Sequence, residues 1–167
     1  MDQTLSLRTA VPSDLAAVET LLGRSYPRLL AVDYPPSVLV TAVPLIARAK
    51  PALLASGRYY VVEDREGRLV GAGGWSLTAP QGEGPGDVAH IRHVATDPDA
   101  LRRGVARAIL ARVFQAAGEA GVAGYDCLST RTAVPFYAAM GFRVVAPVEI
   151  TLAPGIAFPA VRMKRAA

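Results

Sequence analysis

The sequence predicts one α/β domain over residues 1–167, a mixed sheet with helices on both faces. Strand-like segments with alternating apolar residues and helix-like segments with helical apolar spacing follow one another along the chain, and no repeat separates them. The composition is 51% hydrophobic and 19% charged, so ample apolar material is present for a core. Two separate cores would leave each half of the chain near the lower size limit for stability, which favours a single domain.

The first third of the chain is predicted to contain one strand and several helices. Leu5 and Leu7 alternate with polar residues, which indicates a short strand. The Pro-Ser-Asp sequence at residues 12–14 is typical of a helix start, and the apolar residues after it have helical spacing. Residues 34–56 are apolar and helix-like, but prolines interrupt them repeatedly. We therefore expect one or two short helices there rather than one long helix.

A β-hairpin is predicted next. Residues 58–63 and 68–77 are apolar runs on either side of a polar turn that ends in glycine. The glycines at residues 71–74 lie inside a strand and not at a strand-to-helix turn, so we interpret them as sites of close packing or a bulge. A loop rich in glycine and proline, residues 79–86, is expected to be mobile. The strand that follows, residues 87–96, ends at an Asp-Pro pair, where proline stops the pairing.

The last third of the chain alternates helices and strands. Apolar residues on one face predict a helix over residues 104–118. A short strand is expected at 125–129, and a short helix at 133–140 is closed by a glycine. Two further strands are expected, one at 142–145 and one within 156–163.

Charge and cysteine content exclude several classes of function. The formal net charge is +4 and the pI about 9.6, but the arginines are scattered and no run of four basic residues occurs, which argues against nucleic-acid binding. Cys127 is the only cysteine, so an intramolecular disulfide and a cysteine-based zinc site are excluded. No apolar stretch reaches roughly 18 residues and no signal-peptide pattern opens the chain, so we expect a cytoplasmic protein with no membrane partner and no metal.

The predicted helix start at Gly104 is a candidate anion site. Helix N-termini expose unpaired backbone N–H groups, and glycine lets a phosphate approach them closely. The segment 101–112 carries four arginines and no acidic residue, which suits a phosphorylated ligand. No Lys-Ser or Lys-Thr pair follows the glycine, so a Walker-type P-loop is excluded. An ordinary strand-to-helix connection with a solvated arginine face remains the alternative.

Three segments in order carry a resemblance to a known family: Val-Ala-Thr-Asp-Pro at residues 94–98, Arg-Arg-Gly-Val-Ala-Arg at 102–107, and Ala-Val-Pro-Phe-Tyr-Ala-Ala-Met-Gly-Phe at 133–142. Together the chain resembles the GNAT (GCN5-related N-acetyltransferase) superfamily. The resemblance implies a mostly antiparallel sheet of about six or seven strands. It also implies acetyl-CoA as acyl donor and transfer of the acetyl group to a primary amine of a small molecule or protein, by direct attack in a ternary complex.

The resemblance also assigns the residues that contact the donor. The backbone of Val94, Ala95 and Thr96 would pair with the pantetheine arm like an added strand. Thr130 stands where the family commonly has an asparagine that binds the pantetheine region. The chain departs from the family pattern at Leu101, where Gln or Arg is usual, and at Ala106, where Gly is commonest. Phe136 is assigned as a further contact of the donor. The segment assigned to the pyrophosphate consists of Arg102, Arg103, Gly104, Val105, Ala106 and Arg107.

Candidate catalytic residues follow from the same resemblance and from side-chain chemistry. Tyr137 matches the family tyrosine that can protonate the departing thiolate, and a phenol is suited to that transfer. His90 and His93 are candidates for the base that removes the amine's proton, because histidine titrates near neutrality. Strict alternation puts them on opposite faces of the strand, so only one faces the acceptor unless the strand is bulged. His90 is the favoured base, and Asp87 is a further candidate.

Two other readings of the same residues remain. A module that binds CoA without turnover, as a regulatory subunit, would keep the anion site. An O-acyltransferase or an enzyme that uses a longer acyl chain would also keep it. The retained Tyr137 and the two histidines favour catalysis. A homodimer is implied only by the resemblance, since members of the family are often dimers. The acceptor is expected to be a small-molecule or peptide amine.

Overall fold

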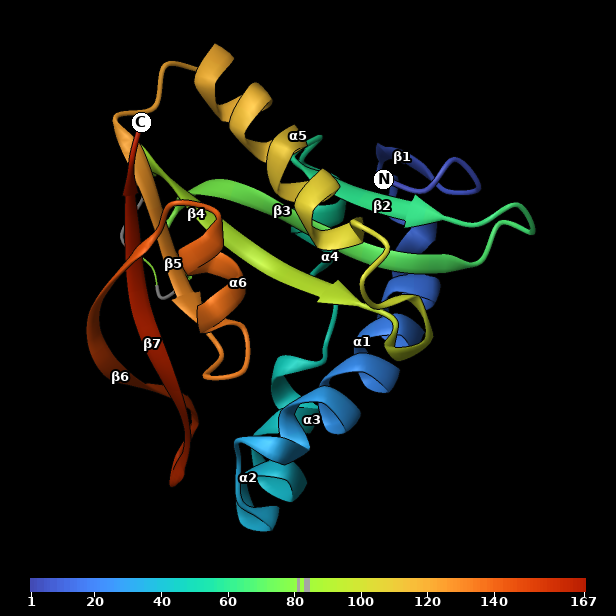
Figure 1. The fold of residues 1–167 in the computed structure, drawn as a ribbon. Helices are drawn as coiled ribbons and strands as arrows, with labels where there is room; N and C mark the ends of the chain where they lie inside the picture. The colour runs from blue at the N-terminus through green and yellow to red at the C-terminus, as the bar shows by residue number, and fades with distance from the viewer. Residues whose placement is uncertain (81, 83–84) are drawn as a thin grey trace.

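The computed structural model of the chain describes residues 1–80, 82 and 85–167, and it contains a seven-stranded mixed sheet within them (Figure 1). The strand order across the sheet is β1-β2-β3-β4-β5-β7-β6. All neighbouring strands are antiparallel except β4 and β5, which are parallel. The predicted fold class is confirmed. The strands are β1 (Ser6–Thr9), β2 (Tyr59–Glu63), β3 (Leu69–Thr78), β4 (Pro85–Thr96), β5 (Gly124–Ser129), β6 (Arg143–Ala153) and β7 (Ile156–Ala166).

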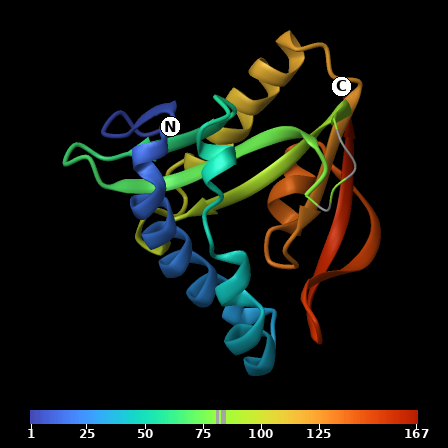
Figure 2. The ribbon, with the colours of Figure 1, turned by 180° about the vertical axis from the view of Figure 1, so that it is seen from behind.

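Helices cover both faces of the sheet, as Figures 1 and 2 show from opposite sides. Buried residues of α5 and α6 form one apolar cluster with the sheet, and buried residues of α1 and α4 form another. None of the helices in the described residues is long and apolar enough to cross a membrane. The helices are α1 (Leu15–Leu29), α2 (Pro36–Thr41), α3 (Val43–Ile46), α4 (Pro51–Leu54), α5 (Val105–Glu119) and α6 (Val134–Ala139), with 3-10 turns at Pro12–Asp14, Leu30–Val32 and Pro98–Ala100.

The parallel pair β4 and β5 separates partway along its length. Pairing runs only from Val88 to His90 on β4, opposite residues 124–126 of β5. Beyond that point β4 continues to Thr96 and β5 continues to Ser129, but the two strands no longer pair with each other, and they diverge in Figure 1. The divergence leaves unpaired backbone at the middle of the sheet, and the candidate site lies there.

A β-bulge marks the point of divergence on β4. Arg92 pairs with Gly74 and Ala95 pairs with Ala72, so two residues of β4, His93 and Val94, lie opposite the single intervening glycine of β3. His93 has a φ of 48°, a left-handed conformation that is unusual for a non-glycine residue. The bulge turns its side chain away from strict alternation.

The glycines of β3 allow this close approach, as the sequence predicts. A Cβ on Gly73 would lie 2.8 Å from Cγ2 of Val94 and 2.9 Å from Cγ2 of Ile109. A Cβ on Gly71 would overlap Cγ1 of Val105. Glycine at these positions therefore lets α5 and the bulge pack directly on β3.

The structure differs from the predicted elements in two regions. Residues 34–56 hold three short helices, where one or two were expected, and each begins with a proline in its first turn. The strand expected at 142–145 extends to Ala153, because β6 pairs with β7 along almost its whole length. Of the loop expected at 79–86, residues 81 and 83–84 lie outside the described part, and β4 begins at Pro85.

Candidate functional site

A cavity of about 430 Å³ lies where β4 and β5 diverge, and we call it the donor cleft. Its walls come from α1, the end of β4, the loop before α5, the first turn of α5, and α6 with the loop before it. No aspartate or glutamate is among its described lining residues. The lining comprises Ser25, Tyr26, Leu29, Leu30, Val94, Ala95, Thr96, Ala100, Leu101, Arg102, Gly104, Val105, Ala106, Arg107, Thr130, Thr132, Ala133, Phe136 and Tyr137.

The N-terminus of α5 forms the polar end of the donor cleft. Gly104 caps the helix with a φ of 76°, and Arg102 has a φ of 61°, so the chain turns sharply into the helix. The exposed arginines Arg102 and Arg107 line the cleft beside the first N–H groups of the 15-residue helix. This end is therefore suited to a phosphate or another anion.

Arg103 is the one residue of the expected donor segment that does not line the cleft. Its guanidinium binds Asp2 at 2.9 Å and the hydroxyl of Thr4 at 2.8 Å. The side chain thus fastens the N-terminal segment to the loop before α5 and is not aimed at the donor. The assignment of Arg103 to the pyrophosphate segment stays a prediction, and its side chain is engaged by Asp2 and Thr4 of the N-terminal segment.

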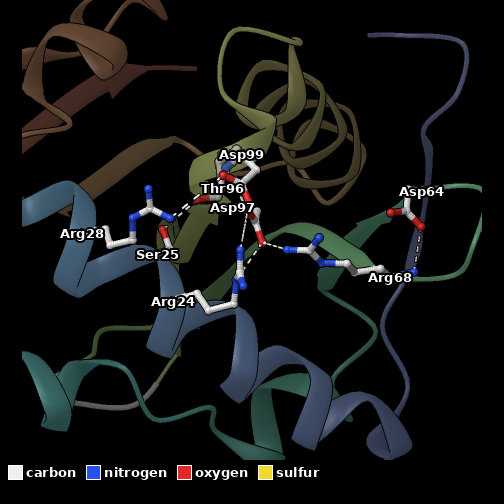
Figure 3. A network of polar contacts seen from close by, with 8 residues as sticks. All are labelled: Arg24, Ser25, Arg28, Asp64, Arg68, Thr96, Asp97 and Asp99. Atoms are coloured by element: carbon white, nitrogen blue, oxygen red, sulfur yellow. Dashed lines mark hydrogen bonds and ion pairs between the residues drawn. The ribbon is translucent and has the colours of Figure 1, made fainter.

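The edge of β4 that lines the cleft is fastened to α1 (Figure 3). Ser25 of α1 donates its hydroxyl hydrogen to the carbonyl oxygen of Thr96 at 2.8 Å. Asp97, only 1% exposed, accepts hydrogen bonds from Arg24 at 3.2 Å and from Arg68 at 2.8 Å. Burial alone raises the pKa of Asp97, but the backbone N–H of Asp99 and the guanidinium of Arg24 bring it below its ordinary value. The last residues of β4 are held in place by charged contacts.

A second cavity, of about 210 Å³, shares lining residues with the donor cleft, and we call it the acceptor cavity after the ligand that the family resemblance would place beside the donor. Five residues line both cavities: Tyr26, Val94, Thr130, Ala133 and Tyr137. We call this shared lining the junction. Its residues come from α1, the bulge of β4 and the segment from the end of β5 into α6.

Tyr137, the candidate acid, is buried at the junction. Burial, followed by the nearby Cys127, raises the pKa of its phenol well above the ordinary value of 10. The phenol is therefore protonated at neutral pH. Phe136 packs edge-on against it with ring centroids 5.2 Å apart, and Phe142 packs against it at 5.5 Å.

Tyr26 is a second phenol at the junction and was missed by the sequence reasoning. It lies on α1, four residues after the buried Leu22, so its helical spacing marks it only as a core residue. Burial, followed by Cys127, raises its pKa above the ordinary value. The single available signal was a tyrosine among aliphatic residues on the buried face of α1.

Of the two histidines, the structure brings His93 to the site. His93 lines the acceptor cavity, and the hydroxyl of Tyr59 donates a hydrogen bond to its carbonyl oxygen at 2.9 Å. Burial, followed by the positive charges of Arg92 and Lys50, lowers the pKa of His93 to about 4. The imidazole is thus neutral at physiological pH.

Neither His90 nor Asp87 is among the described residues that line the two cavities. His90 is opposite Ser76 on one side and Asp126 on the other, in the paired part of β4. Burial lowers its pKa, while the charge of Asp126 acts in the opposite direction. Asp87 is exposed at the other end of the strand. The preference for His90 over His93 is not supported by this arrangement, because the bulge presents His93 to the cavity.

Thr130, at the end of β5, lines both cavities as a donor contact would. Its hydroxyl oxygen accepts a hydrogen bond from the backbone N–H of Ala133 at 3.2 Å. The neighbouring Ser129 is buried and donates its hydroxyl hydrogen to the carbonyl oxygen of Thr130 at 2.7 Å. Of these two hydroxyls, only that of Thr130 belongs to a residue lining the donor cleft.

Solved structures with the same fold include N-acetyltransferases. A GCN5-related N-acetyltransferase from Rhodopseudomonas palustris is 22% identical, with a TM-score of 0.79, and the match covers 100% of this chain and 98% of that one. The PaiA N-acetyltransferase from Thermoplasma acidophilum, in complex with coenzyme A, is 12% identical with a TM-score of 0.72, covering 99% and 100% of the two chains. The ribosomal-protein-S18-alanine N-acetyltransferase from Escherichia coli is 17% identical with a TM-score of 0.62, covering 97% and 93%.

Sequence comparisons give one family and no close relative. No curated protein sequence matches significantly. The model of the family described as "Acetyltransferase (GNAT) domain" matches residues 55–144, more than half of the chain, and this range includes β4, α5, β5 and α6, which build most of the donor cleft. The protein therefore belongs to the GNAT family of acetyltransferases.

Proposed function

We propose that the protein transfers an acetyl group from acetyl-CoA to a primary amine by direct attack in a ternary complex. The observation that carries this proposal is the junction: the donor cleft and the acceptor cavity share five lining residues, and Tyr137 is one of them. A donor in one cavity and an amine in the other would meet there. The reaction needs this arrangement, since amine and thioester must approach each other directly.

The donor cleft has the features that a CoA thioester requires. Its polar end offers the N-terminus of α5 with Arg102 and Arg107 to the pyrophosphate. The unpaired edge at Val94, Ala95 and Thr96 offers backbone groups to the amide-containing pantetheine arm. The absence of a carboxylate from the described lining leaves nothing there to repel the phosphates.

Tyr137 at the junction and His93 of the acceptor cavity would carry out the proton transfers. The amine nitrogen attacks the acetyl carbonyl carbon, a C–N bond forms, the C–S bond breaks, and CoA leaves as a thiolate. His93 takes the amine's proton directly or through a water molecule, and Tyr137 gives its phenolic proton to the thiolate. A backbone N–H of Val94 or Ala95 polarises the carbonyl oxygen.

Direct transfer is preferred to an acyl-enzyme because of the state of Cys127. This thiol lines the acceptor cavity but is only 3% exposed. Burial raises its pKa to about 12, so the nucleophilic thiolate is scarce at neutral pH. A buried, reduced cysteine also suits the cytoplasm, where we place the reaction.

Calorimetric titration with acetyl-CoA, CoA and NADH tests the donor site. We expect micromolar binding of both CoA compounds and none of NADH. Gly104→Leu should weaken binding about tenfold or more by forcing a side chain into the left-handed turn beside the cleft. Gly121→Leu is the matched control, because Gly121 follows the same helix with a φ of 75° against 76° at Gly104 and lies outside the cleft lining.

Turnover with a panel of primary amines tests the transfer itself. Acetyl-CoA binding without acetylation of any amine would favour the regulatory module, and acetylation of alcohols alone would favour the O-acyltransferase. No binding of either CoA compound would overturn the proposal. Equal weakening by the two glycine variants would mean that the strain acts through the fold and not through the cleft.

A further inference from the structure

The acceptor cavity has apolar walls and is small. Its volume of about 210 Å³ is below the roughly 300–1,000 Å³ typical of sites for drug-sized ligands. A compact acceptor with an apolar side group therefore fits it better than an extended polar one. The apolar wall, drawn from α3, β4, β5, β6 and β7, consists of Leu45, Ile46, Ile91, Leu128, Ile150, Leu152 and Phe158.

The charged residues of the acceptor cavity are all basic. Lys50 and Arg92 belong to its described lining, which contains neither aspartate nor glutamate. Both cations contribute to the lowered pKa of His93, which lines the same cavity. A purely cationic acceptor, such as a polyamine, would be repelled by this pair.

Arg92 is only partly engaged by the protein. Its Nη1 donates a hydrogen bond to the hydroxyl of Ser76 at 2.9 Å. Within the described residues no carboxylate lies within 4.0 Å of its guanidinium, and no buried polar side-chain atom is left without a partner. The remaining N–H groups of this half-buried side chain are therefore in contact with solvent, and Arg92 lines the cavity. A guanidinium with free donors is suited to a carboxylate, which it can bind with two hydrogen bonds.

We propose that the acceptor is an amino-carboxylate with an apolar side group, such as an apolar α-amino acid, whose carboxylate is bound by Arg92 and Lys50. This inference rests on the proposed function and names the substrate class of the same site. The cations near His93 hold the carboxylate, the apolar wall holds the side group, and the amine faces the junction. The bound carboxylate also offsets the positive charge around His93, which favours proton uptake by the imidazole.

Matched acceptors test the carboxylate directly. We expect L-leucine to be acetylated with a kcat/KM about ten- to hundredfold higher than 3-methylbutylamine, which lacks only the carboxylate. L-leucinamide should also be a poor acceptor. Its amine is less basic than that of leucine and so more often neutral, which means that a preference for leucine cannot arise from amine basicity. O-phosphoethanolamine serves as an anionic amine without an apolar group and should be poor.

Substitutions then assign the role to the two cations. Arg92→Met should lower the ratio of kcat/KM for L-leucine to that for 3-methylbutylamine by about tenfold or more, Lys50→Met should lower it less, and Arg92→Lys should recover part of it. Lys164→Met is the matched lysine control, since Lys164 is the chain's other lysine and lies outside the cavity lining. Arg143→Met, an exposed arginine on β6, is the matched arginine control.

The outcomes separate this inference from the proposed function. Equal acetylation of L-leucine and 3-methylbutylamine, or a ratio that Arg92→Met leaves unchanged, overturns the inference and leaves N-acetylation standing. If no amine turns over, calorimetry of L-leucine with the CoA-loaded protein decides it. If the protein binds L-leucine and Arg92→Met weakens that binding about tenfold, the inference is supported although the proposed catalysis is not. If the protein does not bind L-leucine, the inference is overturned.

Discussion

At the scale of single residues, two phenols at the junction compete for the role of acid. Tyr26 and Tyr137 both line the donor cleft and the acceptor cavity, and burial raises the pKa of each. Both are protonated at neutral pH, so protonation state does not distinguish them. We propose Tyr137 for the role because of its position in the family motif, and substitution tests that proposal.

Tyr137→Phe should lower kcat by about 100-fold, because general acid catalysis typically contributes that much or more. Acetyl-CoA affinity should change little, since the aromatic ring remains in place. Tyr26→Phe, which removes a hydroxyl from the same junction, should cost much less. Steady-state release of CoA measures both. Unchanged turnover in Tyr137→Phe would contradict its role as acid. An equal decrease of kcat in both variants would mean that the two hydroxyls help to order the junction and that neither is the specific acid.

His93 should make the protein less stable in mild acid. Its pKa is about 4 in the folded chain against an ordinary value of 6.5, so the unfolded chain binds more protons between those values. Above pH 6.5 the histidine is neutral in both the folded and the unfolded chain and does not lower the free energy of unfolding. As the pH decreases from 6.5 towards 4, the free energy of unfolding falls, by about 2 kcal/mol at roughly pH 5. His93→Gln should lose less free energy of unfolding than the wild type between about pH 7.5 and pH 5.

Urea denaturation at the two pH values measures this difference. Carboxylates with lowered pKa values also destabilise the fold in acid, but they are common to both proteins and cancel in the comparison. His90→Gln is the control on the same strand, and it should restore less because Asp126 favours the protonated form of His90. Parallel losses in the wild type and His93→Gln would show that the imidazole is not held in its neutral form.

At the scale of elements, Asp97 joins α1 to the end of β4. It lies directly after Thr96, whose carbonyl oxygen Ser25 binds, and it receives Arg24 from α1 and Arg68 from the β2–β3 turn (Figure 3). The same α1 surface forms a wall of the donor cleft. The network therefore sets the spacing between that wall and the strand edge expected to bind pantetheine.

Asp97→Asn should lower the free energy of unfolding by about 1–2 kcal/mol and weaken CoA binding about tenfold. The cost is moderate because the two arginines are 41% and 50% exposed and can turn to water. Asp99→Asn is the matched control, since the side chain of Asp99 is 65% exposed and its carboxylate pairs with Arg24, one of the two arginines that bind Asp97. Denaturation and calorimetry measure the two effects. Equal effects of both variants would contradict an anchoring role for Asp97.

The order of elements could be predicted from local patterns, and the errors have physical causes. The apolar spacing predicted the start of α1 after Asp14 and both ends of α5 within one residue, because both helices bury one stripe. The expected strand at 142–145 was too short because the chain beyond it is held by pairing with β7, which local pattern does not reveal. In residues 34–56, each of the three short helices has a proline in its first turn, so the prolines divide the segment and do not only interrupt it.

At the scale of the whole molecule, the site depends on contacts between distant segments. The residues expected to bind the donor are nearly contiguous, at residues 94–107, with a partner segment near residue 133, and apart from Arg103 they line one cavity. The pairing of Arg103 with Asp2 and the place of Tyr26 at the junction could not be predicted, and the sequence did not decide between the bulge found at His93 and strict alternation. Each is decided by residues on another element, and a single sequence does not encode such neighbours in its local pattern.

The sheet itself consists of two parts that a donor would connect. In the part of the chain that the structure describes, the antiparallel strands β1 to β4 pair with the group β5, β7 and β6 at Val88, Ala89 and His90. The backbone N–H of Ala123 also donates a hydrogen bond to the carbonyl oxygen of Asp87, at 2.7 Å. The donor cleft has lining residues on both parts, Val94 to one side and Thr130 to the other. A ligand in the cleft would therefore bridge the two parts of the sheet where β4 and β5 are not paired with each other.

Donor binding should accordingly stabilise the whole molecule and protect both sides of the cleft. At a CoA concentration of 100 times Kd, linkage adds about 2.7 kcal/mol, which corresponds to a rise in Tm of about 5–10 °C for a chain of this size. Hydrogen exchange should slow at residues 94–96 and at 130–137 together, while β1 changes little because it lies at the far edge of the sheet. Protection confined to one side of the cleft would mean that the ligand does not connect the two parts of the sheet, even if Tm rises.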